Sequence, residues 1–111
     1  MSIVFEDNFR EAQQLINSLT VEGLQMVALF VVGEAKRRCP VDTGYLRGSI
    51  GYSILRFNNR FVLRIYTNVE YAIFVHEGTR RMQARRFIRD AIEQKQDRIA
   101  RIVNEALKRG L

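Results

Sequence analysis

The stretch from Pro40 to Ser49, which reads PVDTGYLRGS, decides how this chain folds. Proline lacks a backbone N–H and its ring crowds the preceding turn, so Pro40 must end any helix that comes before it. Asp42 and Thr43 can bond nearby backbone groups with their side-chain oxygens, and Gly44 can adopt a positive φ without steric cost. We therefore expect a rigid hinge here, which ends a helix and opens a strand at Leu46.

The segment before the hinge carries apolar residues at helical spacing. The stripe consists of Phe9, Ala12, Leu15, Ile16, Leu19, Leu24, Val27, Ala28, Val31 and Ala35. With Asp7 as N-cap, this pattern predicts one long helix that ends near Arg38 and is kinked near residues 20–23. Four further apolar residues lie outside the stripe, so the helix should be covered on a second side: Met26, Leu29, Phe30 and Val32. The cover is either the domain's own C-terminal helix or a neighbouring subunit.

The segment after the hinge alternates apolar and polar residues, which is typical of strands. The inward positions are Leu46, Ile50, Tyr52 and Ile54 in a first strand, and Phe61, Leu63 and Ile65 in a second. Asn58-Asn59 between them predicts the tight turn of an antiparallel hairpin. The alternation changes phase at Leu55 and Phe57, which indicates a bulge or a strand that leaves the sheet. Residues 69–76 fit either a third strand or a helical turn.

A last apolar stripe predicts a helix from about Arg86 to Arg109, which Gly110 would end. The expected fold is therefore α+β and forms one domain over residues 1–111. It has a long N-terminal helix, an antiparallel β-hairpin plus a short third element, and a long C-terminal helix packed on the sheet.

Composition limits the class of protein. The chain has 111 residues, of which 47% are hydrophobic and 27% charged, as is ordinary for one folded domain. A single cysteine excludes an internal disulfide and favours a reducing compartment. The most apolar run, Leu24 to Gly33, is about half as long as the ~20 residues that a bilayer crossing needs. We expect no membrane segment.

The net charge of +6 is placed unevenly along the chain. Residues 1–77 carry eight Lys+Arg and eight Asp+Glu, whereas residues 78–111 carry ten and four, so the whole excess lies in the last third. One interpretation is a nucleic-acid-binding module whose arginines contact phosphates. Its candidate residues are Arg80, Arg81, Arg85, Arg86 and Arg89. The other interpretation is a solvated or partner-facing protein surface.

No catalytic constellation is evident. Asp42-Thr43-Gly44 matches the aspartic-protease tripeptide, but here it follows a proline-stopped helix instead of a buried strand, which favours a turn. His76-Glu77 begins like a zinc-binding helix, yet Arg80 stands where the second histidine is required. His76 should be structural and Cys39 a small apolar residue. We expect no enzyme, no cofactor, no metal and no small-molecule substrate.

Two segments resemble the tailed-phage neck and tail-component family, the gene-product-ten-like family that includes head-tail joining and tail-completion proteins. The first segment is Ala35-Lys36 followed by residues 40–50, PVDTGYLRGSI. The second contains Tyr71, Ala72, Val75, Glu77, Gly78, Thr79, Met82, Ala84, Phe87 and Ala91. Their order and the gap between them also fit the family.

This resemblance implies a virion structural protein, made in the cytoplasm of the bacterial host, that forms a ring between the head connector and the tail tube. Such rings are commonly hexameric or twelvefold. Its partners would be other copies of the chain, the connector or head-closure protein, the tail tube protein and passing DNA.

The resemblance also assigns roles to signature residues. Asp42, Thr43 and Gly44 would fix the hinge, and Tyr71, Glu77, Gly78 and Thr79 would shape the facing loop. The remaining hinge or signature residues are Pro40, Leu46, Arg47 and Phe87. We expect an ion pair between Glu77 and Arg47 to join the two.

Overall fold

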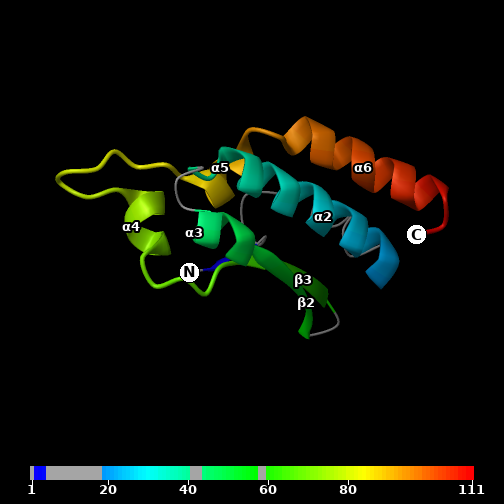
Figure 1. The fold of residues 1–111 in the computed structure, drawn as a ribbon. Helices are drawn as coiled ribbons and strands as arrows, with labels where there is room; N and C mark the ends of the chain where they lie inside the picture. Colours follow the sequence, from blue (N-terminus) through cyan, green and yellow to red (C-terminus); the bar gives the residue numbers. More distant parts are fainter. Residues whose placement is uncertain (1, 5–18, 41–43, 58–59) are drawn as a thin grey trace.

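The computed structural model describes residues 2–4, 19–40, 44–57 and 60–111. The elements in chain order are β1 (Ser2–Val4), α2 (Val21–Arg38), α3 (Gly44–Ser49), β2 (Gly51–Phe57), β3 (Arg60–Tyr66), α4 (Ala72–Glu77), α5 (Phe87–Glu93) and α6 (Gln96–Lys108) (Figure 1). The α+β class and the hairpin are therefore as predicted.

The sheet has the order β1-β3-β2, and both pairs are antiparallel. β2 pairs with β3 residue for residue, from Gly51 opposite Tyr66 to Phe57 opposite Arg60. The bulge predicted near Leu55 is therefore wrong. The predicted turn at Asn58-Asn59 lies outside the described residues. The sequence pattern did not predict β1, which covers the other edge of β3.

Helix α2 begins later than predicted. Thr20 is its N-cap, with an extended ψ of 170°, and its Oγ1 accepts a hydrogen bond from the N–H of Gly23 at 3.3 Å. The helix therefore cannot run unbroken through residue 20, since an N-cap has non-helical dihedrals. The predicted helical segment over residues 5–18 lies outside the described residues. At the other end, Cys39 is extended before Pro40, as the restriction on residues preceding proline requires.

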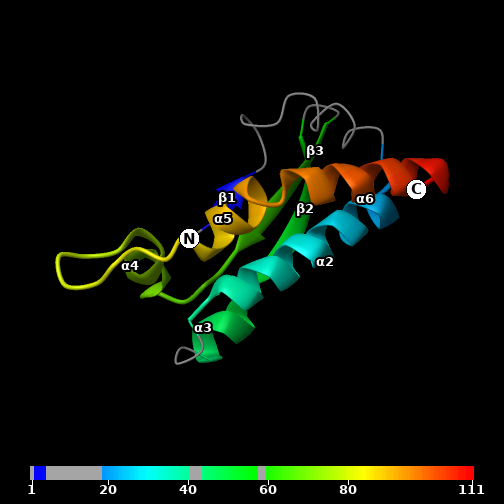
Figure 2. The ribbon, with the colours of Figure 1, turned by 90° about the horizontal axis from the view of Figure 1, so that it is seen from above.

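The core is built around α2. Its predicted stripe is buried at Leu24, Val27, Ala28, Val31 and Ala35. α2 contacts β2 and β3 on one side and α5 and α6 on another (Figures 1 and 2). The chain's own C-terminal helices therefore cover a second side of α2, but the expected cover is missing at Leu29, whose side chain is 62% exposed. The prediction that the last helix packs on the sheet is wrong in detail, because α5 and α6 pack mainly on α2.

The hinge contains a short helix where a strand was predicted. Residues 44–49 form α3, and the strand starts at Gly51 instead of Leu46. Leu46 and Ile50 are both buried, and their i, i+4 spacing fits one helical turn as well as a strand. Ser49 Oγ donates to the carbonyl oxygen of Leu46 at 2.7 Å and so ends the turn. Gly44 is helical, and its φ is not positive.

The predicted C-terminal helix is divided into α5 and α6 at Gln94 and Lys95. α6 ends at Lys108, and Gly110 stops the helix as predicted, with a φ of 78° just after the C-cap Arg109. The N–H of Leu111 bonds Ala106 O at 2.8 Å and that of Gly110 bonds Leu107 O at 3.1 Å, the two hydrogen bonds of a Schellman motif.

Leu111, which follows α6, also forms a hydrogen bond at the start of α2. The carbonyl oxygen of Leu111 accepts a hydrogen bond from the N–H of Thr20 at 2.6 Å. This bond satisfies a backbone donor at the N-terminus of α2 that the helix itself leaves unpaired. No helix in the part of the chain described here is long and apolar enough to cross a membrane.

Candidate functional site

Helix α4 and the loop at residues 78–86 form an arm that extends away from the other elements (Figures 1 and 2). Residues 69–76, which fitted either a strand or a helix, are therefore helical over most of their length. α4 begins where Tyr71 O accepts the N–H groups of Phe74 and Val75, at 3.1 and 3.3 Å. It ends at Gly78, whose φ is 80° and whose N–H bonds Phe74 O at 2.8 Å.

The loop of the arm is folded tightly on itself. The backbones of Thr79 and Met82 exchange two hydrogen bonds, of 2.9 and 3.3 Å, and Thr79 Oγ1 accepts the N–H of Arg81 at 3.2 Å. The N–H of Arg85 then bonds Val75 O at 3.0 Å, which fastens the returning chain to α4. A Cβ on Gly78 would lie 2.7 Å from the nitrogen of Ala84, so the turn needs glycine for both its φ and its close approach.

His76 anchors the arm to α5. Its side chain is fully buried, and its ring meets that of Phe87 edge to face at 5.2 Å. Nε2 accepts the N–H of Arg89 at 3.3 Å, which places the proton of the neutral ring on Nδ1. Nδ1 then donates to Glu77 Oε1 at 2.8 Å. The interpretation of His76 as a structural residue is confirmed.

The charges at the base of the arm are coupled. Burial lowers the pKa of His76, although the hydrogen bond to Glu77 opposes this effect. The hydrogen bond from His76 in turn lowers the pKa of Glu77. Arg86 Nε lies 3.7 Å from Glu77 Oε2, and an Arg89 guanidinium nitrogen lies 3.9 Å from Oε1. The Glu77 carboxylate is therefore engaged by two of the five candidate arginines.

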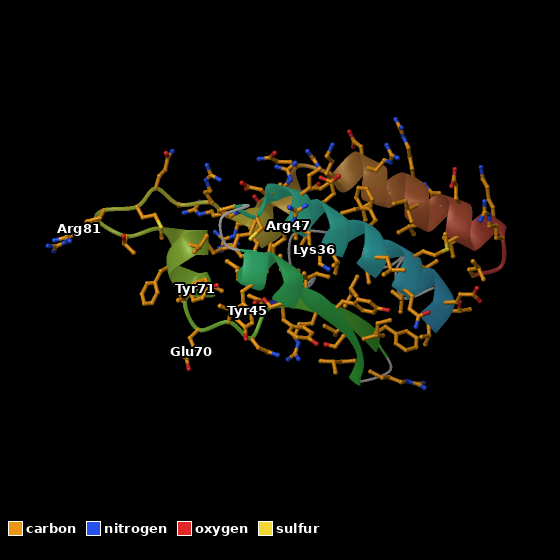
Figure 3. All side chains as sticks on the ribbon, viewed as in Figure 1. Lys36, Tyr45, Arg47, Glu70, Tyr71 and Arg81 are labelled. Atoms are coloured by element: carbon orange, nitrogen blue, oxygen red, sulfur yellow. The ribbon has the colours of Figure 1, made fainter. Side chains whose placement is uncertain are left out.

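The predicted ion pair between Glu77 and Arg47 is wrong. Arg47 lies exposed on α3 (Figure 3), and Glu77 turns to α5 because the arm packs against that helix through His76. The hinge and the base of the arm are joined differently. The hydroxyls of Ser49 and Thr67 are 2.5 Å apart, and Thr67 Oγ1 accepts the N–H of Val69 at 3.3 Å. Sequence patterns missed this link, since single hydroxyl residues carry no periodicity.

The arm exposes four large apolar side chains. The exposed fraction is 40% for Tyr71, 50% for Ile73, 56% for Phe74 and 40% for Met82. Sequence reasoning missed Ile73 and Phe74, because a six-residue helix is too short to show a period. Helical spacing does account for their exposure: Ala72, Val75 and His76 occupy the buried face of α4, so Ile73 and Phe74 point to solvent.

Three arginines lie on the loop of the same arm, namely Arg80, Arg81 and Arg85. All three are exposed, and Arg81 marks the outer end of the arm in Figure 3. Within the described part of the chain, none of them forms an ion pair. We call this set the arm surface: Tyr71, Ile73, Phe74, Met82, Arg80, Arg81 and Arg85.

The remaining predicted site residues are placed as follows. Leu46 and Phe87 are buried core residues, and Pro40 is partly buried after α2. Asp42 and Thr43 lie outside the described residues, so their hinge role stays a prediction. Gly78 and Thr79 lie in the turn of the arm.

A family model described as "Bacteriophage HK97-gp10, putative tail-component" matches residues 4–78. The match spans more than half of the 111 residues, so the chain belongs to this family of phage tail components. It includes the hinge and the arm as far as Gly78, and it confirms the family that the sequence motifs indicated. No curated protein and no solved structure was found to match the chain.

Proposed function

We propose that the protein is a structural virion component of a tailed bacteriophage or prophage that forms a ring at the head-tail junction. Six or twelve copies would stand between the connector or head-closure protein and the tail tube, after synthesis in the host cytoplasm. The family match over residues 4–78 carries this proposal. The exposed apolar face of the arm supports it, since exposed apolar patches mark sites of protein association.

We also propose that the protein acts without catalysis. Its cysteine and its histidine, the side chains best suited to serve as nucleophile and general base, both have structural roles. Cys39 is buried beside the end of α2, and both ring nitrogens of His76 are hydrogen-bonded within the fold. A nucleophile or general base needs access to a substrate.

Native mass and virion composition together test the proposal. Light scattering behind a sizing column, at several concentrations and two salt concentrations, should show assembly toward six or twelve times the 13.0 kDa chain mass. Mass spectrometry of purified virions should detect the chain, and antibody-gold labelling should place it at the neck. Absence from purified virions, or labelling elsewhere on the particle, would contradict the proposal.

A second candidate is a basic nucleic-acid-binding module, favoured by exposure of all five arginines Arg80, Arg81, Arg85, Arg86 and Arg89. Such a module would bind a short duplex as a monomer, with a steep decrease in log affinity against log salt. Two of these arginines already face Glu77, which reduces the charge available to phosphates. A parallel sizing run with added duplex distinguishes the two candidates.

A further inference from the structure

The arm surface has exposed apolar side chains that the described fold leaves uncovered, and arginines that it leaves without an acidic partner. Its apolar side chains are 40–56% exposed, and within the described residues its three arginines have no acidic partner. Burying such side chains would contribute about 25 cal/mol for each Å² of apolar area removed from water. The arm therefore presents apolar area and positive charge together.

We propose that the arm surface docks onto a different protein, whose contact surface is apolar at its centre and surrounded by carboxylates. This inference rests on the proposed function, in which that protein belongs to the adjoining ring of the neck. It assigns the arm to contacts between rings and leaves contacts between copies to other surfaces.

The apolar half of the surface argues for a protein and against DNA. Phosphate contacts would use Arg80, Arg81 and Arg85 alone and would leave Ile73 and Phe74 in water. A protein partner can bury both sets, with aromatic and aliphatic anchors at the centre and arginines near the rim.

The charge of the chain argues against a second copy as partner. Residues 78–111 carry ten basic and four acidic residues, and residues 1–77 are balanced. Among the acidic residues, Glu34 is paired with Arg37 at 2.7 Å and Glu77 faces Arg86 and Arg89. A second copy also carries a net charge of +6, so an acidic partner protein complements the arginines of the arm better than another copy does.

The arm is already ordered for binding. The double hydrogen bond between Thr79 and Met82, the bond from Arg85 to Val75, and the buried ring of His76 hold its shape without a partner. Docking of a preformed surface avoids most of the entropic cost of ordering a loop.

A joining assay with separated particles tests the inference. Heads and tails are isolated from the phage after deletion of the gene for this chain, and purified wild-type protein is added to restore joining, counted by electron microscopy. Phe74→Asp and the double variant Arg80→Glu/Arg81→Glu should each reduce joining at least about tenfold, as loss of a central anchor does. Arg80→Lys/Arg81→Lys should retain most of the joining, since the charge remains.

Two matched controls probe similar residues elsewhere on the surface. Leu29→Asp changes an apolar side chain that is 62% exposed on α2, and Arg101→Glu reverses an exposed charge on α6. Both should join particles as the wild type does. Circular dichroism should confirm that every variant is folded, and light scattering should show wild-type ring mass for the arm variants.

Each other outcome overturns the inference in a recognisable way. Normal joining by Phe74→Asp removes the role of the arm, and loss of ring mass in that variant makes the arm a contact between copies. If the arm variants join particles normally but no longer bind a DNA duplex, the arm is a DNA contact. If the wild-type protein neither forms rings nor restores joining, the proposed function fails as well.

Discussion

The backbone N–H of Arg89 donates a hydrogen bond to Nε2 of His76, although thirteen residues separate the two in the chain. The bond joins α4 to α5 across the base of the arm. The bond is partly buried, the ring of His76 packs edge to face on Phe87, and the other ring nitrogen bonds Glu77. This imidazole therefore contributes to the position of the arm, together with the buried Ala72 and Val75 of α4 and the hydrogen bonds at Thr67.

His76→Ala should lower the free energy of unfolding by about 2–4 kcal/mol, because it leaves a cavity and an unpaired N–H on Arg89. Urea denaturation measures this change, and amide exchange at Arg89 should become faster. Glu77→Gln is the control: the carboxylate is 40% exposed, so its loss should have a much smaller effect. Equal losses for the two variants would show that the buried ring is not the anchor.

Stability should fall as the pH falls through the ordinary range of histidine. Burial lowers the pKa of His76 from 6.5, against the opposing pull of Glu77 and with Arg86 and Arg89 nearby. Below pH 6.5 the unfolded chain binds a proton that the folded state does not, so unfolding becomes easier, by at most about 1.4 kcal/mol per pH unit. Above that range this group contributes no pH dependence.

The pH effect is measured by urea denaturation between about pH 8 and pH 5, on either side of the ordinary histidine pKa. His76→Gln should flatten the slope over this range. The lowered pKa of Glu77 also makes the folded state less stable as the pH falls, but only at lower pH, below 4.5. An unchanged slope in His76→Gln would assign the titration to other groups.

Gly78→Ala and Gly110→Ala separate backbone strain from steric contact. Their φ angles are 80° and 78°, so the left-handed conformation penalises both alanines by a similar amount, about 1–2 kcal/mol. Only at position 78 would the new Cβ collide, at 2.7 Å from Ala84 N and 2.9 Å from Met82 O; nothing lies within 4 Å at position 110. Gly78→Ala should therefore also disturb the arm, seen as faster amide exchange at Arg85. Equal losses of stability and equal amide exchange at Arg85 in the two variants would show that a Cβ at position 78 does not collide with Ala84 or Met82.

The sequence predicted the elements whose period is sustained over many residues. The stripe of α2 extends over three turns, and its members from Leu24 to Ala35 are buried as expected. The hairpin was recognised because Phe61, Leu63 and Ile65 recur with a period of two in β3. The break between α5 and α6 was missed, because Ile92 and Ile99 are seven residues apart and remain on one helix face across it.

The candidate site was predicted less well, since its elements are short and its links are long in sequence. α3 and α4 have six residues each, for which helix and strand patterns look alike. The predicted role of Gly78 and Thr79 in a loop that faces the hinge stays a prediction. The partner of Glu77 was predicted wrongly, because the choice between Arg47 and Arg86 depends on how the arm packs, which local sequence does not encode.

Gly23→Ala and Gly33→Ala, both within α2, should change stability in opposite directions. Alanine favours a helix interior over glycine by about 0.5–1 kcal/mol at either site. At Gly33 nothing lies within 4 Å of the new Cβ, so the variant should be more stable by that amount. At Gly23 the Cβ would lie 2.7 Å from Leu111 O, the atom that accepts the Thr20 N–H, so the variant should be less stable than wild type.

Thermal and urea denaturation of the two variants measure this difference, and each serves as the control for the other because the host helix is the same. The loss at Gly23 reflects displacement of Leu111, which breaks the hydrogen bond to Thr20 and loosens the contact between the ends of α2 and α6. Amide exchange at Thr20 should therefore be faster in Gly23→Ala and unchanged in Gly33→Ala. Stabilisation by both alanines would mean that Leu111 does not hold the start of α2 in solution.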